Sequence, residues 1–307
     1  MNANIISRER SHLLHLEDLY KSYGDKLVLD NIDLSVSAGT LCSVVGPSGC
    51  GKSTLFRLVL GQEQADSGRL FVDGNPVAAP GQDRGIVYQR YSLYPHLSVL
   101  ENAMLARTLP AGFLERQRRR AEFREEAMHY LERTGLAAHA DKYPHELSGG
   151  MQQRVAIAQA LIKRPKILMM DEPFGALDPE TREHMQVLLL ELWEAERMTI
   201  FFVTHDMEEA IYLGTRVVVL SQHYIDDRGS SATVRRGARV VGDYVLPSAV
   251  NSTKVKRSAE FVSLAEEIRR CGFDREVLRH VTEFNLRHPD SFQTLSPEEA
   301  RAARGTA

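Results

Sequence analysis

The sequence predicts an α/β protein with a mainly parallel sheet, and three observations support this class. Short apolar and β-branched runs alternate with longer helical patterns, as expected for consecutive β-α-β units. Several of these runs end in polar or glycine-rich segments, and open α/β sheets bind ligands at such carboxyl ends. The length of 307 residues, with 43% hydrophobic residues, allows one large domain plus an appendage or two compact domains.

Three apolar runs are expected to form core strands. They are Leu41–Val45, Ile167–Met170 and Thr199–Val203. The first leads into a glycine-rich turn, the second into Asp171, and the third into Thr204 and His205. The polar groups of all three are therefore expected at the ligand-binding edge of the sheet.

The stretch from about residue 97 to residue 161 is mostly helical in pattern and lies between the first two strands. It predicts a helical subdomain inserted into the strand-rich fold. The segment from Leu114 to Arg133 inside it is dense in charges of both signs. We interpret these charges as a solvated helix face rather than an RNA-binding patch.

A glycine-rich motif follows the first strand. Its residues are Gly46, Pro47, Ser48, Gly49, Cys50, Gly51, Lys52, Ser53 and Thr54. The pattern of Gly, four residues, then Gly-Lys-Ser is that of a phosphate-binding loop, in which backbone N–H groups and a helix N-terminus surround anionic oxygens. Lys52 is expected to reach the β- and γ-phosphates of a nucleotide, and Ser53 to bind Mg²⁺.

Adjacent carboxylates, Asp171 and Glu172, end the second strand. An acidic turn after a strand is common and says little alone, but here it follows a phosphate-binding loop in the chain. Asp171 is then expected to contact Mg²⁺ through water, and Glu172 to polarise the water that attacks a phosphate.

A polar, glycine-rich segment, Ser148, Gly149 and Gly150, opens an amphipathic helix upstream of Asp171. Capping of that helix by Ser148 would explain the residue types without any ligand. The same N-terminal amides also form an anion site. Because one monomer does not need two phosphate sites, the pair of motifs indicates a phosphate held between two chains.

These motifs, in this order, resemble the ABC ATPase family over roughly residues 13–222. Gln89 is similar to the glutamine of the family's Q-loop, His205 to its switch histidine, and Asp178 belongs to a segment that resembles the D-loop. Tyr23 matches the aromatic residue that stacks on adenine, although a lone Tyr is more often a packing residue of an edge strand. The resemblance implies a P-loop NTPase with a parallel-sheet core, an antiparallel β subdomain and the inserted helical subdomain.

The resemblance also implies a mechanism in which two copies close head to tail. Each ATP is then held between the phosphate-binding loop of one copy and Ser148, Gly149 and Gly150 of the other. Glu172, His205 and Gln89 are the expected catalytic residues, and Ser53, Gln89 and Asp171 the expected Mg²⁺ ligands. Closure of the pair is expected to drive separate transmembrane permease subunits, with a solute-binding protein as an indirect partner.

Within the family, two segments resemble bacterial importer subunits: the one from Tyr94 to Val99, and the one from Tyr143 to Glu146. The runs from Leu188 to Trp193 and from Thr204 to Leu213 are most similar to the nitrate, sulfonate and taurine group. Urea-like and guanidinium-like solutes remain alternatives. The solute is an analogy only, because no residue of an ATPase subunit is expected to touch it.

Composition and charge exclude several other classes. The net charge of −3 gives no basic footprint for nucleic acid. The three widely spaced cysteines, Cys42, Cys50 and Cys271, form neither a disulfide framework nor a zinc pattern. The N-terminus lacks a secretory signal pattern, and the apolar runs are far shorter than the ~20 residues that span a bilayer. We expect a peripheral protein at the cytoplasmic face of the bacterial inner membrane.

Residues 223–307 are expected to form a C-terminal extension that departs from the simplest family pattern. Phe261, Leu264 and Ile268 share one helical face that stops near Gly272, and the apolar residues from Val277 to Phe284 suggest a second helix. We interpret both as packing against the ATPase domain, with a docking or regulatory surface as the alternative. A helix start is expected at Ser296 and disorder at the end of the chain.

A non-transport ABC ATPase, such as a translation or DNA-repair factor, is the competing class. Such proteins usually have two ATPase cores or a long coiled-coil or zinc insertion, whereas this chain has one set of motifs and no such insertion. A slow-hydrolysing binding switch would be expected to lack Glu172 or the segment from Leu147 to Gly150. The transporter interpretation is therefore favoured.

Overall fold

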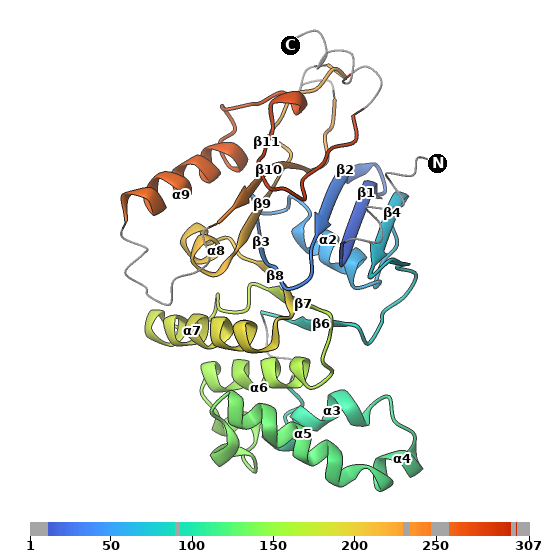
Figure 1. Cartoon of the computed structure of the whole chain (residues 1–307), viewed down its shortest axis with the longest axis vertical. Helices are drawn as coiled ribbons and strands as arrows, with labels where there is room; N and C mark the ends of the chain where they lie inside the picture. The colour runs from blue at the N-terminus through green and yellow to red at the C-terminus, as the bar shows by residue number, and fades with distance from the viewer. Residues whose placement is uncertain (1–11, 90–92, 230–233, 247–257, 296–298, 300–307) are drawn as a thin grey trace. The chain divides into compact units, whose positions relative to one another are not determined.

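The computed structural model describes residues 12–89, 93–229, 234–246, 258–295 and 299. The chain divides into two compact units, one made of residues 1–81 and 201–307 and the other of residues 82–200 (Figure 1). Both units combine strands with helices, so the predicted α/β class is confirmed.

An antiparallel sheet in the first unit has the strand order β2-β1-β4-β5. The strands are β1 (Leu14–Tyr23), β2 (Lys26–Val36), β4 (Ser67–Val72) and β5 (Asn75–Pro76). Leu14, Leu16 and Leu19 of β1 are fully buried, and β1 pairs with both β2 and β4. The antiparallel β subdomain implied by the resemblance is therefore present.

A second group of strands, which belongs to the first unit apart from residues 199 and 200, includes the strand that leads into the phosphate-binding motif. Its order is β11-β10-β9-β3, followed by β8. The strands are β3 (Leu41–Val45), β8 (Thr199–Val203), β9 (Arg216–Ser221), β10 (Arg239–Val245) and β11 (Asn285–Leu286). The pair β3 and β9 is parallel, and β10 runs antiparallel to β9. All five residues of β3 are buried, which explains its continuous apolar run.

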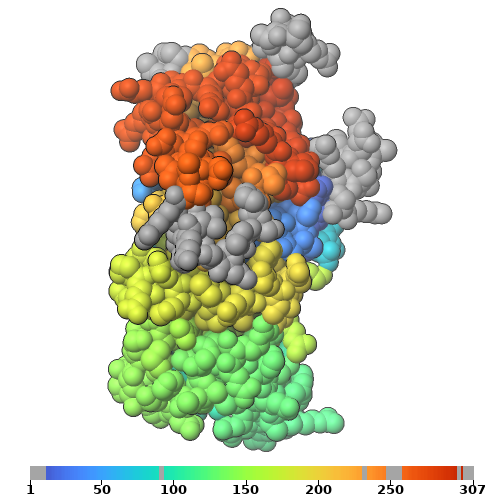
Figure 2. Space-filling model, turned by 60° about the vertical axis from the view of Figure 1, so that its left-hand side comes forward, coloured from blue at the N-terminus to red at the C-terminus, as the bar shows by residue number. Residues whose placement is uncertain are grey.

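These strands are accompanied by helices α2 (Lys52–Val59), α8 (Met207–Leu213) and α9 (Ala259–Gly272). Helix α9 packs on β9 and β10 (Figure 1). A Cβ atom on Gly272 would lie 2.3 Å from Val219 Cγ1, so the end of α9 comes very close to β9. The residues from α9 to β11 form a continuous surface of this unit, coloured orange to red in Figure 2.

The second unit contains two parallel strands and most of the helices. In chain order its elements are β6 (Arg84–Val87), α3 (Val99–Thr108), α4 (Phe113–Arg118), α5 (Arg120–Arg133), the short 3-10 turns Ala137–His139 and Pro144–Glu146, α6 (Gly149–Leu161), β7 (Ile167–Asp171) and α7 (Pro179–Glu196). Helices α3, α5 and α6 pack on one another, as the green segments of Figure 1 show. The strand pair β6 and β7 is parallel.

The predicted core strands are confirmed as β3, β7 and β8, with β7 one residue longer than predicted. Helices α3 to α6 fill the range in which the helical subdomain was expected. The charge-dense segment forms α4 and α5, and the half-buried Arg119 between these two helices pairs with Glu115 and Glu122. This arrangement fits a solvated helix face.

The second C-terminal helix is not formed, and that prediction is wrong. Val281–Glu283 makes a 3-10 turn, and Asn285–Leu286 pairs with Gly242 and Asp243 of β10. Val281 is buried, while the Phe284 ring packs edge-on against Tyr224 at 5.9 Å. The apolar residues thus face different neighbours, and hydrogen bonding to β10 competes successfully with a helix.

The expected helix start at Ser296 and the expected disorder at the chain end fall on positions outside the described residues, apart from Glu299. Among the described helices, none combines the length and the apolar character needed to cross a membrane.

Candidate nucleotide-binding site

The candidate residues fall into two groups. The first unit contains Tyr23, the motif from Gly46 to Thr54, and His205. The second unit contains Gln89, Ser148, Gly149, Gly150, Asp171, Glu172 and Asp178.

The phosphate-binding motif is a turn between the buried strand β3 and helix α2. Gly51, the last residue before the helix, has a φ of 102°, a conformation that L side chains rarely adopt. A Cβ atom at this position would also lie 2.7 Å from Leu29 Cδ2 on β2. Glycine is therefore required here both by backbone conformation and by space. The turn leaves the first N–H groups of α2 without intrahelical partners.

The Lys52 side chain folds over this turn. Its ammonium donates to the carbonyl oxygens of Gly46 (2.7 Å) and Pro47 (3.0 Å), and the residue is only 8% exposed. These contacts fix the position of the positive charge beside the turn. Ser53 next to it is exposed, so its hydroxyl can be reached by a ligand.

Cys50 lies inside the same turn but is buried. Burial is the main reason that the pKa of its thiol is raised, although the nearby Lys52 acts in the opposite direction. The thiol is therefore kept neutral, and Cys50 contributes packing rather than a nucleophile.

Tyr23 and His205 are the other candidates in the first unit. Tyr23 is the last residue of β1, and 43% of it is exposed. His205 is exposed and lies two residues after the end of β8. The next residue, Asp206, accepts hydrogen bonds from the N–H groups of Glu208 and Glu209 and so caps α8. This cap fixes the backbone that presents His205.

Asp171 and Glu172 lie at the carboxyl end of β7 in the second unit. Asp171 is the last residue of the strand, and both residues are half-buried. Glu172 has a φ of 46°, which is left-handed backbone that costs a non-glycine residue free energy. Such strain persists only where the surroundings enforce it, and it occurs frequently at active sites.

Gln89 lies close to Glu172 in this unit. The Gln89 Nε2 atom is 3.3 Å, and the Glu172 Oε2 atom 4.0 Å, from the point where a Cβ of Gly175 would stand. The absence of a side chain at Gly175 thus allows the amide and the carboxylate to share one small space. Sequence spacing alone did not predict this proximity.

Ser148 caps helix α6 by accepting a hydrogen bond from the N–H of Met151 at 3.3 Å. Gly150 in the first turn is buried, and a Cβ atom there would lie 2.5 Å from the methyl group of Thr181 on α7. Ser148 therefore does cap α6, but helix capping does not explain why position 150 is a glycine. That glycine is required by the close approach of α7.

Asp178 caps α7 by accepting the N–H of Thr181 at 3.0 Å. This backbone hydrogen bond is the main reason that the pKa of the Asp178 carboxyl is lowered. Thr181 thus links the expected D-loop to Gly150, a link that sequence reasoning missed. No sequence signal points to Thr181, because its role depends on the distance between two helices.

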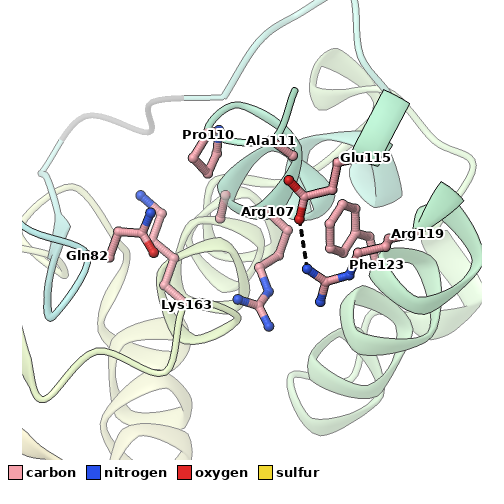
Figure 3. Close-up of a pocket in the computed structure, with 9 residues that line it drawn as sticks. Gln82, Arg107, Pro110, Ala111, Glu115, Arg119, Phe123 and Lys163 are labelled. Atoms are coloured by element: carbon pink, nitrogen blue, oxygen red, sulfur yellow. Dashed lines mark hydrogen bonds and ion pairs between the residues drawn. The ribbon is translucent and has the colours of Figure 1, made fainter. Parts of the chain in front are cut away.

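A separate pocket in the second unit is lined by Arg107, Arg119 and Lys163, together with Gln82 and Phe123 (Figure 3). Arg107 pairs with Glu126, and Arg119 with Glu115 and Glu122. Two of the three cations are therefore already neutralised by carboxylates. None of the candidate site residues lines this pocket.

Comparison with known proteins places this geometry in a family. A family model described as "ABC transporter" matches residues 29–175. The nitrate import ATP-binding protein of Synechocystis sp. is 41% identical over 264 residues, which cover 83% of this chain and 94% of that protein. The chain belongs to the ABC transporter family.

Two further comparisons extend this result. The aliphatic sulfonates import ATP-binding protein of Bacillus anthracis is 41% identical to this ABC ATPase over 202 residues, 66% of this chain and 77% of the relative. A solved dimeric ATP-binding cassette, in a post-hydrolysis state with bound ADP and Pi, matches with a TM-score of 0.60 and 30% identity over 76% of this chain and 99% of its own. The chain is thus an ATPase with the ABC fold, as the sequence predicted.

Proposed function

We propose that the chain is the ATP-hydrolysing subunit of a bacterial importer for a small anion such as nitrate, a sulfonate or taurine. It works at the cytoplasmic face of the inner membrane, with separate permease subunits and a solute-binding protein. Similarity to the nitrate and sulfonate import proteins supports this assignment of the solute. The observation that carries the hydrolytic role is the strained Glu172 beside Gln89 at the end of β7.

In this proposal the first unit binds the nucleotide. The N–H groups of the turn from Gly46 to Thr54 donate to phosphate oxygens, and Lys52 supplies a fixed positive charge. Tyr23 offers its exposed ring to the adenine, and His205 acts near the γ-phosphate. The contacts of Lys52 with Gly46 and Pro47 support this role because they hold the turn around the ammonium.

Glu172 is the proposed base that orients the attacking water, and Gln89 helps to hold that water or a cation. A second copy of the chain completes each site with Ser148, Gly149 and Gly150, and Asp178 lies at the same interface. The exposed Ser148 at the N-terminus of α6 supports this, because the amides and dipole of the helix start favour a negatively charged partner. The dimeric relative with bound ADP and Pi supports a paired arrangement.

The donor set suits Mg²⁺ rather than a transition metal. The proposed ligands are the hydroxyl of Ser53, the carboxylate of Asp171 and the amide oxygen of Gln89, all hard oxygen donors. Among the described residues, no cluster of three or more His, Cys, Asp or Glu side chains could hold a metal. Mg²⁺ bound with a nucleotide does not need such a cluster, because phosphates and waters supply most of its shell. It would neutralise charge on the phosphates during hydrolysis.

A groove next to Gln89 is the proposed contact for the permease. Tyr88 and Tyr94 flank the Gln89 segment, are 41% and 46% exposed, and line this groove together with Leu109 and Ala156. Exposed aromatic residues around a partly apolar groove are typical of a protein contact. Tyr94→Ala should then abolish transport while the ATP turnover of the isolated chain stays unchanged.

The hydrolytic role is tested with purified wild type, Glu172→Gln and Glu191→Gln, by phosphate release and light scattering with Mg-ATP. Glu191 is an exposed residue of α7 and provides the matched control. We expect the Glu172 variant to lose turnover and accumulate as an ATP-bound dimer, whereas the control behaves like wild type. Normal turnover of Glu172→Gln would refute the assignment of the base.

The solute is tested in the organism that contains the gene, by deleting it and measuring uptake of labelled nitrate, taurine and an alkanesulfonate. Loss of uptake of one anion, restored by wild type but not by Glu172→Gln, is the expected result. Normal uptake of all three, together with loss of urea or guanidinium uptake, would contradict the assignment of an anion.

A further inference from the structure

The Tyr23 side chain belongs to a closed cluster with Arg57 and Glu63. Its phenol donates a short hydrogen bond to Glu63 Oε2 and accepts one from Arg57 Nη2 at 3.2 Å. Arg57 Nε lies 2.8 Å from Glu63 Oε1, which completes the triangle. Each of the three side chains thus contacts both of the others, so the tyrosine ring is held by its polar end while 43% of the residue stays exposed.

The backbone around this cluster is fixed at both ends. The N–H groups of Gln62 and Glu63 donate to the carbonyl of Arg57, so the segment after α2 folds back on the end of the helix. Further along, the N–H of Asp66 donates to Tyr20, and its carboxylate accepts the N–H of Ser22 at 2.6 Å. Glu63 therefore lies on a short segment anchored to α2 on one side and to β1 on the other.

Arg57 also contacts the phosphate-binding motif. Its Nη2 atom is 3.4 Å from the hydroxyl oxygen of Thr54, one helical turn earlier on α2. Thr54 is the last residue of the motif, and it is buried. The same guanidinium thus contacts both the proposed phosphate subsite and the aromatic residue proposed to stack on the base.

Lys21 limits how the Tyr23 ring can be used. Its ammonium lies over the ring, 5.4 Å from the centroid, and is itself held by the carbonyl of Gln64 and by Asp66. One face of the ring is therefore turned toward a cation, which leaves the other face for a flat ligand.

We propose that Arg57 and Glu63 are positioning residues that orient the ring of Tyr23 for stacking on the adenine and fix its distance from the phosphate-binding turn. This inference rests on the proposed role of Tyr23. The two residues do not touch the nucleotide in this scheme. They lower the ordering cost of the stacked ring, so they increase affinity for the base without changing the hydrolytic step.

An ordinary surface ion pair is the alternative explanation for Arg57 and Glu63, which are 44% and 27% exposed. Such pairs contribute little to stability, and their removal should leave nucleotide binding unchanged. The two explanations differ in one measurable quantity, the affinity for ATP relative to the affinity for inorganic tripolyphosphate. Tripolyphosphate occupies the phosphate subsite but has no base to stack.

The experiment measures binding of ATP and of tripolyphosphate to wild type, Tyr23→Ala, Tyr23→Phe, Glu63→Ala and the control Glu17→Ala, together with KM and kcat. Glu17 lies on β1, the strand that contains Tyr23, and forms a similar ion pair with Arg69 on β4. We expect Tyr23→Ala to weaken ATP binding roughly 5- to 100-fold through lost stacking. Tyr23→Phe and Glu63→Ala should each raise the KM for ATP roughly three- to ten-fold, the size of one ordinary hydrogen bond, because this bond is exposed to solvent. In Glu63→Ala and in the control Glu17→Ala, kcat and tripolyphosphate affinity should stay unchanged.

Combining Tyr23→Phe with Glu63→Ala should add little to either single change, because both remove the same contact. If Tyr23→Ala weakens ATP binding but Tyr23→Phe and Glu63→Ala do not, the positioning role is overturned while the role of Tyr23 stands. If Tyr23→Ala itself has no effect, the role of Tyr23 in the proposed function fails, and this inference with it. Equal loss of ATP and tripolyphosphate affinity in Glu63→Ala would also overturn it, since that result indicates general distortion of the turn.

Discussion

Arg216 and Asp243 form a buried ion pair that joins β9 to β10. Arg216 Nε and Nη2 donate to the two carboxylate oxygens at 2.8 and 2.6 Å, and the side chains are 0% and 2% exposed. Arg216 Nη1 also donates to the carbonyl of Ser35 at 2.6 Å. All three contacts are within the first unit. The positive charge of Arg216 on β9 is thus neutralised by Asp243 on β10, a strand of the C-terminal extension.

Asp243→Asn should destabilise the first unit by roughly 3 kcal/mol, because the buried Arg216 then keeps only the more distant carboxylate of Asp290, at 3.8 Å, as a counter-ion. The change is measured from the midpoint of urea-induced unfolding. The control is Glu122→Gln, which removes a fully exposed partner of Arg119 and should leave the midpoint unchanged. Equal midpoints for wild type and Asp243→Asn would contradict a structural role for the pair.

Asp33 should make stability depend on pH. Burial raises the pKa of its carboxyl from 3.8 to about 6, although it accepts hydrogen bonds from the backbone N–H groups of Asp18 and Thr294. The folded state therefore binds this proton more tightly than the unfolded state does. The stabilisation is complete below about pH 3.8 and is lost as the pH rises through about 6.

This dependence is measured as the free energy of unfolding of wild type and of Asp33→Asn, which stays neutral. From about pH 5 to about pH 7.5, wild type should lose roughly 1–1.5 kcal/mol more than the variant. Altered hydrogen bonds change the stability of the variant by the same amount at every pH, so the comparison uses only the difference in slope. Parallel pH profiles would show that Asp33 does not titrate in this range.

Gly150→Ala should disturb the contact between α6 and α7, because the new methyl group would lie 2.5 Å from Thr181 Cγ2. Overpacking of this kind costs roughly 1–3 kcal/mol. Adding Thr181→Ser removes the opposing methyl group and should restore stability. If Gly150 also faces the phosphate of a partner chain, the double variant should fold normally and still hydrolyse ATP slowly. Full recovery of both properties would limit Gly150 to packing.

Lys52→Ala should weaken binding of ATP and of tripolyphosphate alike, roughly 10- to 100-fold, since the lost contact is to phosphate. The exposed Lys26 on β2 provides the matched control through Lys26→Ala. Binding is measured by calorimetry in the presence of Mg²⁺. This pattern differs from that expected for Glu63→Ala, where only ATP binding is weakened. Unchanged tripolyphosphate affinity in Lys52→Ala would contradict the role of the lysine.

Local patterns in the sequence determined much of the fold. The strands β3, β7 and β8 were predictable because a fully buried strand needs a short continuous apolar run. The residues after each strand were predictable as a site because glycines, Lys52 and paired carboxylates are required at fixed spacing for phosphate chemistry. These features depend only on residues that are close together in the chain, so they can be read directly from the sequence.

Contacts between distant residues were decided only by the tertiary structure. Strand β10 was not predicted, because Arg239 and Asp243 look like surface residues until Asp243 meets Arg216. The residues from Val277 to Phe284 were predicted as a helix, yet the chain forms a turn at Val281–Glu283 and then the strand Asn285–Leu286, which pairs with β10. Likewise, Gln89 and Glu172 both lie next to Gly175, and Glu63 contacts Tyr23, across separations that no local pattern encodes. Residue types restrict which groups can interact, but only the packing of the whole chain determines which of them do.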